Sequence, residues 1–183
     1  MKKNLYIVFL LFFIYCNDEN KFKYLDCDGV ENGNAMDCFG CTDELAINYD
    51  NTSTQNDGHC IWSYQMTQNQ SFYFIKNILD STGNQFSIDD FYIGAFNNNT
   101  CIGHRKWVGE YTDIPAMGNS GDMNNYLNVG NIPSFRLYNN VEQKEYLLDF
   151  DGNCYNSGDH INIINCGFIN NGIYYISSLN LVY

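Results

Sequence analysis

Two cysteines, Cys41 and Cys60, bracket the polar loop that most constrains how this chain can fold. The loop is rich in Asp, Asn and Thr and poor in apolar side chains. A segment of this kind cannot bury enough apolar surface to fold alone, so it needs a disulfide, a metal ion or both. Structural disulfides persist in oxidising compartments, and the loop therefore predicts a secreted or cell-surface protein.

The N-terminus predicts the same location. Lys2 and Lys3 precede an uninterrupted apolar run over residues 5–15, which has the length of a signal-peptide core and is too short to cross a hydrocarbon layer of ~30 Å. We therefore expect residues 1–16 to be a signal peptide. Cys16 and the acidic residues behind it resemble the lipidated cysteine and surface-export tag of Bacteroidetes lipoproteins. Ordinary secretion is the alternative, and membrane contact is expected only through the leader or a lipid anchor.

The composition is strongly acidic. The 183 residues carry a formal net charge of −12 and include only 9 Lys plus Arg. Such a surface repels phosphate backbones and anionic lipids, which argues against nucleic-acid and membrane-surface binding. It suits Ca²⁺, which binds several oxygen ligands. Aromatic residues make up 16% of the chain and there are 2 prolines, which predicts a strand-rich core and not disorder.

The mature chain divides into two parts. Residues 17–62 hold four cysteines, show no periodicity and are predicted to be a small, disulfide-stapled, loop-rich segment. Residues 63–183 show apolar runs separated by Gly, Asn, Asp and Ser clusters, which predicts an all-β fold, an antiparallel β-sandwich. The expected strands are 71–79, 91–97, 101–108, 134–138, 145–150, 160–166 and 173–182.

Strand alternation also predicts the core of the sandwich. The side chains expected to point inward are Phe72, Phe74, Ile93, Phe135, Leu137 and Ile176. Residues 114–133 contain the run Gly-Asn-Ser-Gly-Asp and are expected to form a long ordered surface loop.

The spacing of Cys38 and Cys41 is Cys-x-x-Cys, which has three interpretations. A zinc ribbon needs a second such pair, and a thioredoxin-like site needs a βαβ pattern; this chain has neither. Disulfides fit the loop composition better. Of the three possible connectivities we predict Cys27–Cys38 and Cys41–Cys60, and closing the second loop should stabilise the fold by ~3 kcal/mol.

Three cysteines lie in the predicted sandwich. We predict that Cys154 pairs with Cys166. Cys101 is then left free, paired between chains or joined to the N-terminal segment.

Residues 40–60 carry a specific resemblance. The pieces Gly40-Cys41-Thr42-Asp43, Ala46-Ile47-Asn48-Tyr49 and Asp57-Gly58-His59-Cys60 are similar to a repeat of secreted proteins from marine Bacteroidetes and from some algae and their viruses. Ile47 stands where many copies carry a third cysteine, which leaves Cys41 and Cys60 to pair.

Two further parts of the chain extend this resemblance. Residues 26–30, with Asn32-Gly33 and Ala35, resemble the companion Asp-Cys-x-Gly-Val repeat. Residues 70–183 resemble a β-rich module found beside such repeats. The matching pieces are 70–74, 90–96, 101–103, 114–118, 132–135 and 176–179. The resemblance implies extracellular display and brings no known reaction.

The stapled loop offers hard oxygen ligands for Ca²⁺. The candidate ligands are Asp43, Asn48, Asp50, Asn56 and Asp57. Their spacing does not match the twelve-residue EF-hand loop. The alternative is a solvated polar loop held by Asx turns.

A second candidate site lies where the third expected strand meets the long loop. Trp107, Tyr111 and Asp113 could stack on a sugar and hydrogen-bond to it. The alternative for Trp107 is a place in the core, and Tyr111 is the better candidate for exposure.

No residue constellation identifies a reaction. His59, His104 and His160 are scattered, and the motifs His-Glu-x-x-His and Gly-x-Ser-x-Gly do not occur. The sequence therefore predicts a non-enzymatic extracellular module for adhesion or for binding a glycan or an extracellular protein. The alternatives are a small secreted polysaccharide hydrolase and a structural spacer.

The calcium hypothesis can be tested by thermal unfolding. If Asp50 and Asp57 are ligands, millimolar Ca²⁺ should raise the melting temperature, because the ion binds the native state selectively. An Asp57→Ala protein should lose that response. A wild-type melting curve that does not move with Ca²⁺ would show that the loop is merely polar.

Overall fold

The computed structural model describes residues 26, 29–31, 33, 38–86 and 90–182. The chain forms two compact units, residues 1–38 and 39–183, and each is described by itself. Few residues of the first unit are described, and the leader with Cys16 lies outside them. In the second unit, the stapled loop 41–60 and the β-sandwich belong together. No helix among the described residues is long and apolar enough to span a membrane.

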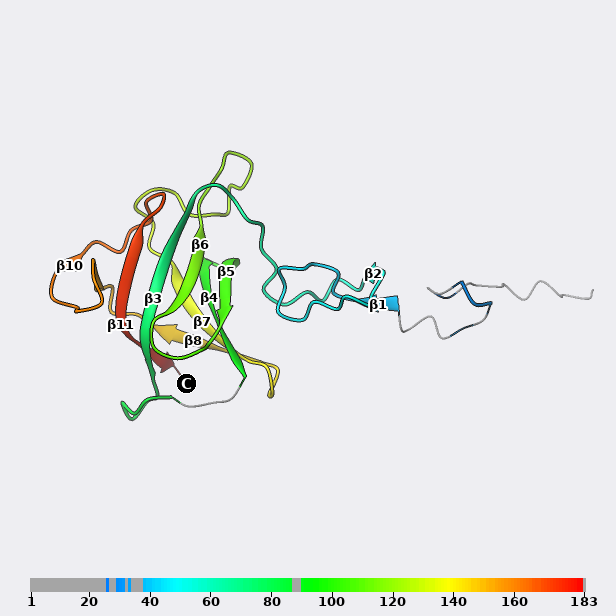
Figure 1. Ribbon diagram of the computed structural model, residues 1–183, viewed down its shortest axis with the longest axis horizontal. Coiled ribbons are helices and arrows are strands. Elements are labelled where there is room, and N and C mark those ends of the chain that lie inside the picture. Colours follow the sequence, from blue (N-terminus) through cyan, green and yellow to red (C-terminus); the bar gives the residue numbers. More distant parts are fainter. Residues whose placement is uncertain (1–25, 27–28, 32, 34–37, 87–89, 183) are drawn as a thin grey trace, which may run out of the picture. The chain divides into compact units, whose positions relative to one another are not determined.

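One strongly curved sheet makes both layers of the sandwich (Figure 1). Its seven longer strands follow the order β6-β3-β11-β8-β7-β4-β5, and the short strands β9 and β10 extend it beside β11. The bounds are β3 Gln70–Leu79, β4 Phe91–Asn97, β5 Thr100–Lys106, β6 Thr112–Met117, β7 Ser134–Asn139, β8 Lys144–Asp149, β9 Cys154–Tyr155, β10 Ile163–Ile164 and β11 Ile173–Val182. Two further short strands, β1 Phe39–Gly40 and β2 Gln55–Asn56, pair within the stapled segment.

The prediction of an all-β fold with a largely antiparallel sheet is confirmed. One pair in the large sheet departs from it, because β3 and β11 run parallel, with Tyr73 opposite Tyr174. Every other strand pair of that sheet is antiparallel.

Tyr73 lies at the centre of the core and is fully buried. Its ring stacks on Tyr174 at 4.8 Å and meets Phe135 of the opposite layer edge-on at 5.7 Å. Its hydroxyl donates to the carbonyl of Cys166 at 2.8 Å, so the buried polar atom is satisfied. Burial raises the pKa of Tyr73 and keeps this hydroxyl protonated.

The two ends of the curved sheet approach each other at β5 and β6. A Cβ on Gly103 would lie 2.0 Å from the backbone oxygen of Pro115. Only glycine permits this approach of one backbone to another. Pro115 fits because β6 pairs with a single strand, β3, and an edge strand tolerates a residue without an N–H group.

Most expected strands are present, and two expectations are wrong. The prediction of a strand over 160–166 is wrong, because only residues 163–164 are strand and Ile161 is 72% exposed. The loop expected over 114–133 is also wrong at its start. Residues 112–117 form β6, whose Ile114 and Ala116 are fully buried.

The inward face of β3 is also the reverse of the predicted one. Tyr73 and Ile75 are fully buried, whereas Phe72 and Phe74 are only half-buried and lie on the outer face. Phe74 stacks there on Tyr175 at 5.1 Å. The run Phe-Tyr-Phe-Ile is apolar on both faces, so alternation could not fix its phase. The other predicted core residues, Ile93, Phe135, Leu137 and Ile176, are buried as expected.

Two predicted disulfides are confirmed. Cys41 pairs with Cys60 and Cys154 pairs with Cys166, with Cα atoms 4.9 and 5.3 Å apart. Cys38 is also disulfide-bonded, and its predicted partner Cys27 lies outside the described residues.

The close approach of β5 to β6 predicts that position 103 tolerates only glycine. Gly103→Ala should lower the free energy of unfolding by about 1–3 kcal/mol, because the backbone that the new methyl group meets cannot move aside. Gly58→Ala is the matched control, since Gly58 also has a positive φ but has open space where its Cβ would be. Equal losses in denaturant titrations of both variants would contradict the packing argument.

Candidate functional site

The candidate site is a cleft of about 560 Å³ in the second compact unit. Its walls come from three places: Asp43 with residues 63–65, the start of β5, and residues 122–126. The volume lies within the ~300–1,000 Å³ of typical ligand pockets. Its lining mixes carboxylate, hydroxyl and amide groups with two tyrosine rings.

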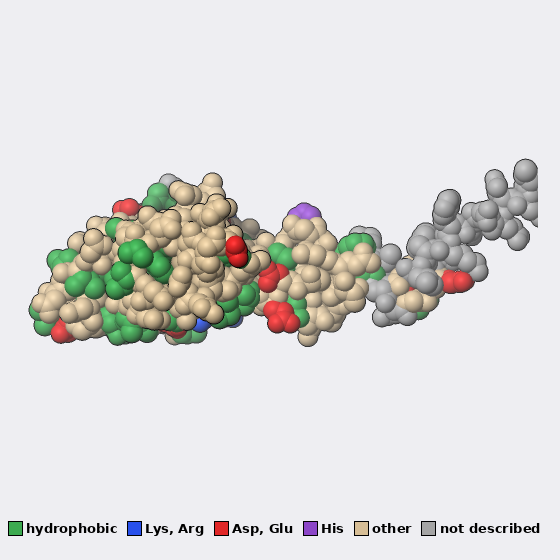
Figure 2. Space-filling view, turned by 90° about the horizontal axis from the view of Figure 1, so that it is seen from above, with side chains coloured by type: hydrophobic (Ala, Val, Ile, Leu, Met, Phe, Trp, Pro, Cys, Tyr) green, Lys and Arg blue, Asp and Glu red, His purple; other side chains and the backbone are tan. Residues whose placement is uncertain are grey.

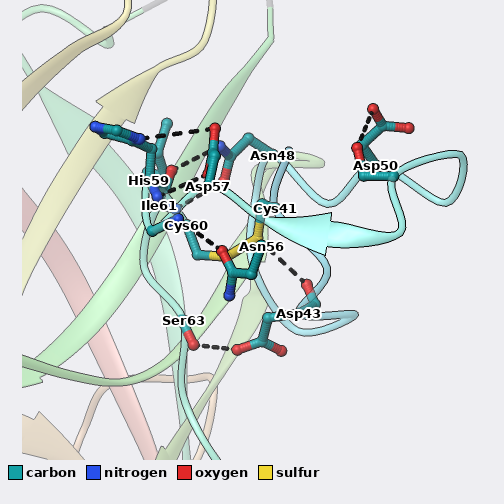
Figure 3. Close-up of a disulfide and its surroundings, with 12 residues drawn as sticks. Cys41, Asp43, Asn48, Asp50, Asn56, Asp57, His59, Cys60, Ile61 and Ser63 are labelled. Atoms are coloured by element: carbon teal, nitrogen blue, oxygen red, sulfur yellow. Dashed lines mark hydrogen bonds and ion pairs between the residues drawn. A yellow bond between two sulfur atoms is a disulfide. The ribbon is translucent and has the colours of Figure 1, made fainter. Parts of the chain in front are cut away.

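Asp43 and Ser63 form the first wall. Asp43 accepts a hydrogen bond from the amide of Leu45 at 2.9 Å through Oδ1, which starts the turn that follows Cys41. Its Oδ2 accepts a hydrogen bond from the Ser63 hydroxyl (Figure 3). Both carboxylate oxygens are therefore engaged, and the side chain serves as a fixed part of the wall.

Trp62 anchors this wall to the outer face of the sheet. Its backbone has a φ of 53°, and its side chain is buried against Phe96 at 5.2 Å and Tyr138 at 5.7 Å. The indole N–H donates to Glu145 at 2.8 Å. The ring lies over Gly94, where an added Cβ would come within 2.9 Å of it. The segment after the staple is thus held by an aromatic cluster and one hydrogen bond.

His104 of β5 contacts the stapled loop and holds it against the sheet. Its Nε2 lies 2.8 Å from the carbonyl oxygen of Leu45; since a carbonyl can only accept, Nε2 donates. Its Nδ1 is buried and has no hydrogen-bond partner among the described residues. The ring packs edge-on against Tyr64, a wall residue, at 5.4 Å. Burial lowers the pKa of His104 and favours the neutral ring.

The second wall is the segment that follows β6. Leu127 is fully buried and its amide donates to the carbonyl of Met117, while the amide of Asn119 donates to the carbonyl of Leu127 at 2.8 Å. Tyr126 joins this wall to the first, because its hydroxyl accepts a hydrogen bond from the amide of Gln65 at 2.6 Å. The cleft is therefore held open by internal hydrogen bonds.

Three polar side chains of this wall are free to bind a ligand. Among the described residues, the side chains of Asp122, Asn124 and Asn125 make no hydrogen bond or ion pair, and all three are exposed. Asp43 differs from them in this respect. The lining includes no Lys, Arg or His, so the cleft presents negative and neutral groups only. Figure 2 shows few basic side chains on the face it presents, in keeping with the net charge of −12.

Cys101 lies beside the cleft and is the free cysteine among the described residues. Burial raises the pKa of its thiol to about 12, so the nucleophilic thiolate does not form near neutral pH. Within the described part of the chain Cys101 is a free, buried thiol, and a disulfide between two chains stays an alternative.

The residues predicted to bind a ligand lie outside the cleft. Trp107 is partly buried and stacks on Phe91 at 5.9 Å. The Tyr111 hydroxyl donates to the carbonyl of Gly158 at 2.9 Å. Asp113 is 45% exposed, and its carboxylate lies 3.7 Å from Arg105. The cleft is instead lined by residues 122–126, at the far end of the predicted loop. The Asp-x-Asn-Asn-Tyr sequence of this segment is the pattern from which a polar binding site could have been predicted.

The five predicted calcium ligands each make local hydrogen bonds. Asp50 accepts from Thr52 and Ser53, and Asp57 accepts from the amide of His59 at 2.8 Å. Asn48 and Asn56 likewise accept from backbone amides. The Thr52 hydroxyl and amide hold the pKa of Asp50 below its usual value.

The carboxylates of this loop do not converge. Figure 3 shows Asp43, Asp50 and Asp57 pointing to different sides of the stapled loop. In the described part of the chain, no three His, Cys, Asp or Glu side chains lie close enough together to hold a metal ion. Calcium binding stays a prediction for the melting experiment.

No family model, curated protein or solved structure matches this chain. The function must therefore be argued from the site itself.

The buried His104 generates a prediction about pH. The pKa of His104 in the folded protein lies below the 6.5 of an unfolded histidine. As the pH falls below 6.5, the unfolded chain therefore binds more protons than the folded chain. The free energy of unfolding should be highest above pH 6.5 and should fall as the pH drops toward the folded pKa. His104→Gln keeps an N–H donor and removes the titration, so its stability should fall less between pH 6.5 and 5.

Chemical unfolding at several pH values measures this slope. His160 contributes with the same sign, because burial also lowers its pKa, so the slope should shrink and not vanish. His59→Gln, which changes a side chain that is 85% exposed, is the matched control. An unchanged slope in His104→Gln would show that this ring does not carry the effect.

Proposed function

We propose that this protein is a non-enzymatic extracellular or cell-surface module that binds a glycan in the cleft between the stapled segment and residues 122–126. The observation that carries the proposal is the free carboxylate of Asp122 and the free amide of Asn124 on one wall of a preformed polar cleft. Carboxylate and amide groups can each accept hydrogen bonds from sugar hydroxyls, and the amide can also donate one.

The other lining groups suit the same ligand. The side chain of Met123 is partly exposed and gives the cleft an apolar surface against which the C–H face of a sugar can pack, while Tyr64 and Tyr126 also line the cleft but are largely buried. The carboxylates of Asp43 and Asp122 repel anionic ligands. The ligand expected from this lining is a neutral glycan and not a sulfated or uronic-acid polymer.

Binding without catalysis is the simpler proposal for this cleft. A glycosidase needs two carboxyl groups free to act as acid and as base or nucleophile. Asp43 has both oxygens engaged by Leu45 and Ser63. Cys101, the nearby thiol, is protonated at neutral pH. These contacts support a binding module over the alternative, a secreted hydrolase.

The location forms part of the proposal. The disulfides Cys41–Cys60 and Cys154–Cys166 are consistent with an extracellular protein. Secretion itself, and attachment through a lipid on Cys16, rest on the sequence of the first sixteen residues. An adhesive module would fit this location, and an extracellular protein is the alternative partner.

A glycan array followed by isothermal titration tests the proposal. Asp122→Asn and Asn124→Ala should each weaken binding of the selected neutral glycan roughly ten- to a hundred-fold, as expected for the loss of ~1–3 kcal/mol from one hydrogen bond. Asp149→Asn, which changes an exposed carboxylate on β8, is the matched control and should bind normally.

Two further measurements separate the alternatives. Tyr111→Ala and Asp113→Ala should leave binding unchanged if the cleft is the site; a loss confined to these two variants would place the ligand on the outer face of β3 and β6. Incubation of the same glycan with the protein should release no new reducing ends. Hydrolysis that disappears in Asp122→Asn would favour the enzyme.

A further inference from the structure

A second polar hollow, of about 500 Å³, lies next to the cleft along the chain. It is lined by residues 66–69 together with Asn119 and Ser120. This lining holds amides, hydroxyls and one thioether and carries no charge. It therefore suits the same neutral, hydroxyl-rich ligand as the cleft.

The same two segments of the chain, residues 63–69 and 119–126, contribute to the lining of both hollows. Gln65 lines the cleft and Met66, the next residue, lines the second hollow; on the opposite segment Ser120 lines the second hollow and Asp122, two residues later, lines the cleft. Neighbouring residues of an extended chain are about 3.3 Å apart, so on the side of Gln65 and Met66 a single step along the backbone leads from the cleft to the second hollow.

Hydrogen bonds tie these walls together on both sides of the division. Beside the second hollow, Thr67 donates through its hydroxyl to the carbonyl of Gly118 at 3.0 Å, and Asn69 donates through its side chain to the carbonyl of Asn119 at 2.7 Å. The bond from Gln65 to Tyr126 does the same beside the cleft. Both hollows are thus preformed, which lowers the entropy cost of binding.

We propose that the second hollow is a further subsite for the ligand of the cleft, so that the ligand is a linear neutral oligosaccharide that crosses from one hollow to the other. This proposal rests on the proposed function of the cleft. Each hollow alone lies within the ~300–1,000 Å³ of a typical small-molecule pocket. A ligand of one or two sugar rings would occupy the cleft and leave the second hollow to water.

Titrations with oligosaccharides of increasing length test the proposal. The probes are cello-, manno- and xylo-oligosaccharides from disaccharide to hexasaccharide. In the series that binds, affinity should rise at least about tenfold once the chain is long enough to fill both hollows, and then level off. Met66→Ala combined with Gln68→Ala should remove this gain and leave disaccharide affinity unchanged. Both side chains are exposed, so the fold should persist.

The controls distinguish the two proposals. Gln55→Ala changes an exposed residue of the stapled loop and should keep the full dependence on length. Equal affinity for all lengths, weakened throughout by Asp122→Asn, would overturn the second subsite and leave the cleft as the site. An absence of binding at every length would overturn both. A gain with length that survives the double variant would place the extension elsewhere.

Discussion

The parallel pairing of β3 with β11 is the constraint on which the rest of the sandwich depends. This pairing joins the first and last long strands of the sheet. β11 in turn pairs with β8, the strand that begins the other layer. Ordering so distant a pair as β3 and β11 costs loop-closure entropy, and the stack of Tyr73 on Tyr174 is one of the core contacts that together offset it. β3 is the one strand with which β6 pairs, so the wall of the cleft that follows β6 is positioned through this same pair.

The staple and the site are physically linked. The Cys41–Cys60 disulfide holds a loop that has little apolar surface, and Trp62 and His104 then fasten the loop to β4 and β5. Asp43, which lies two residues after Cys41, becomes part of the cleft only because both fastenings hold. A covalent constraint that makes the loop fold therefore also places a wall of the proposed binding site.

The sequence predicted the strands that turn residues delimit on both sides. The strands 91–97 and 173–182 match the structure at both ends. β6 was hidden because Pro115 and the Gly-Asn-rich run behind it indicate a loop, and only its place at an edge makes a proline acceptable there. The site was harder to predict than the fold. Tyr111 and Asp113 have the right chemistry, but Asp122 reaches the cleft through the packing of Leu127 and Tyr126, contacts that no local pattern shows.

The distribution of satisfied and free polar groups separates scaffold from site. The carboxylates of Asp43, Asp50 and Asp57 accept bonds from their own loop, which keeps a polar segment ordered without a large core. Asp122 and Asn124 lie on an equally polar segment and make no such side-chain bonds among the described residues. Their segment is instead ordered by its backbone and by buried Leu127. Because backbone hydrogen bonds and the buried Leu127 order this segment, the side chains of Asp122 and Asn124 are available to a ligand. Substituting them should therefore weaken binding with little effect on stability.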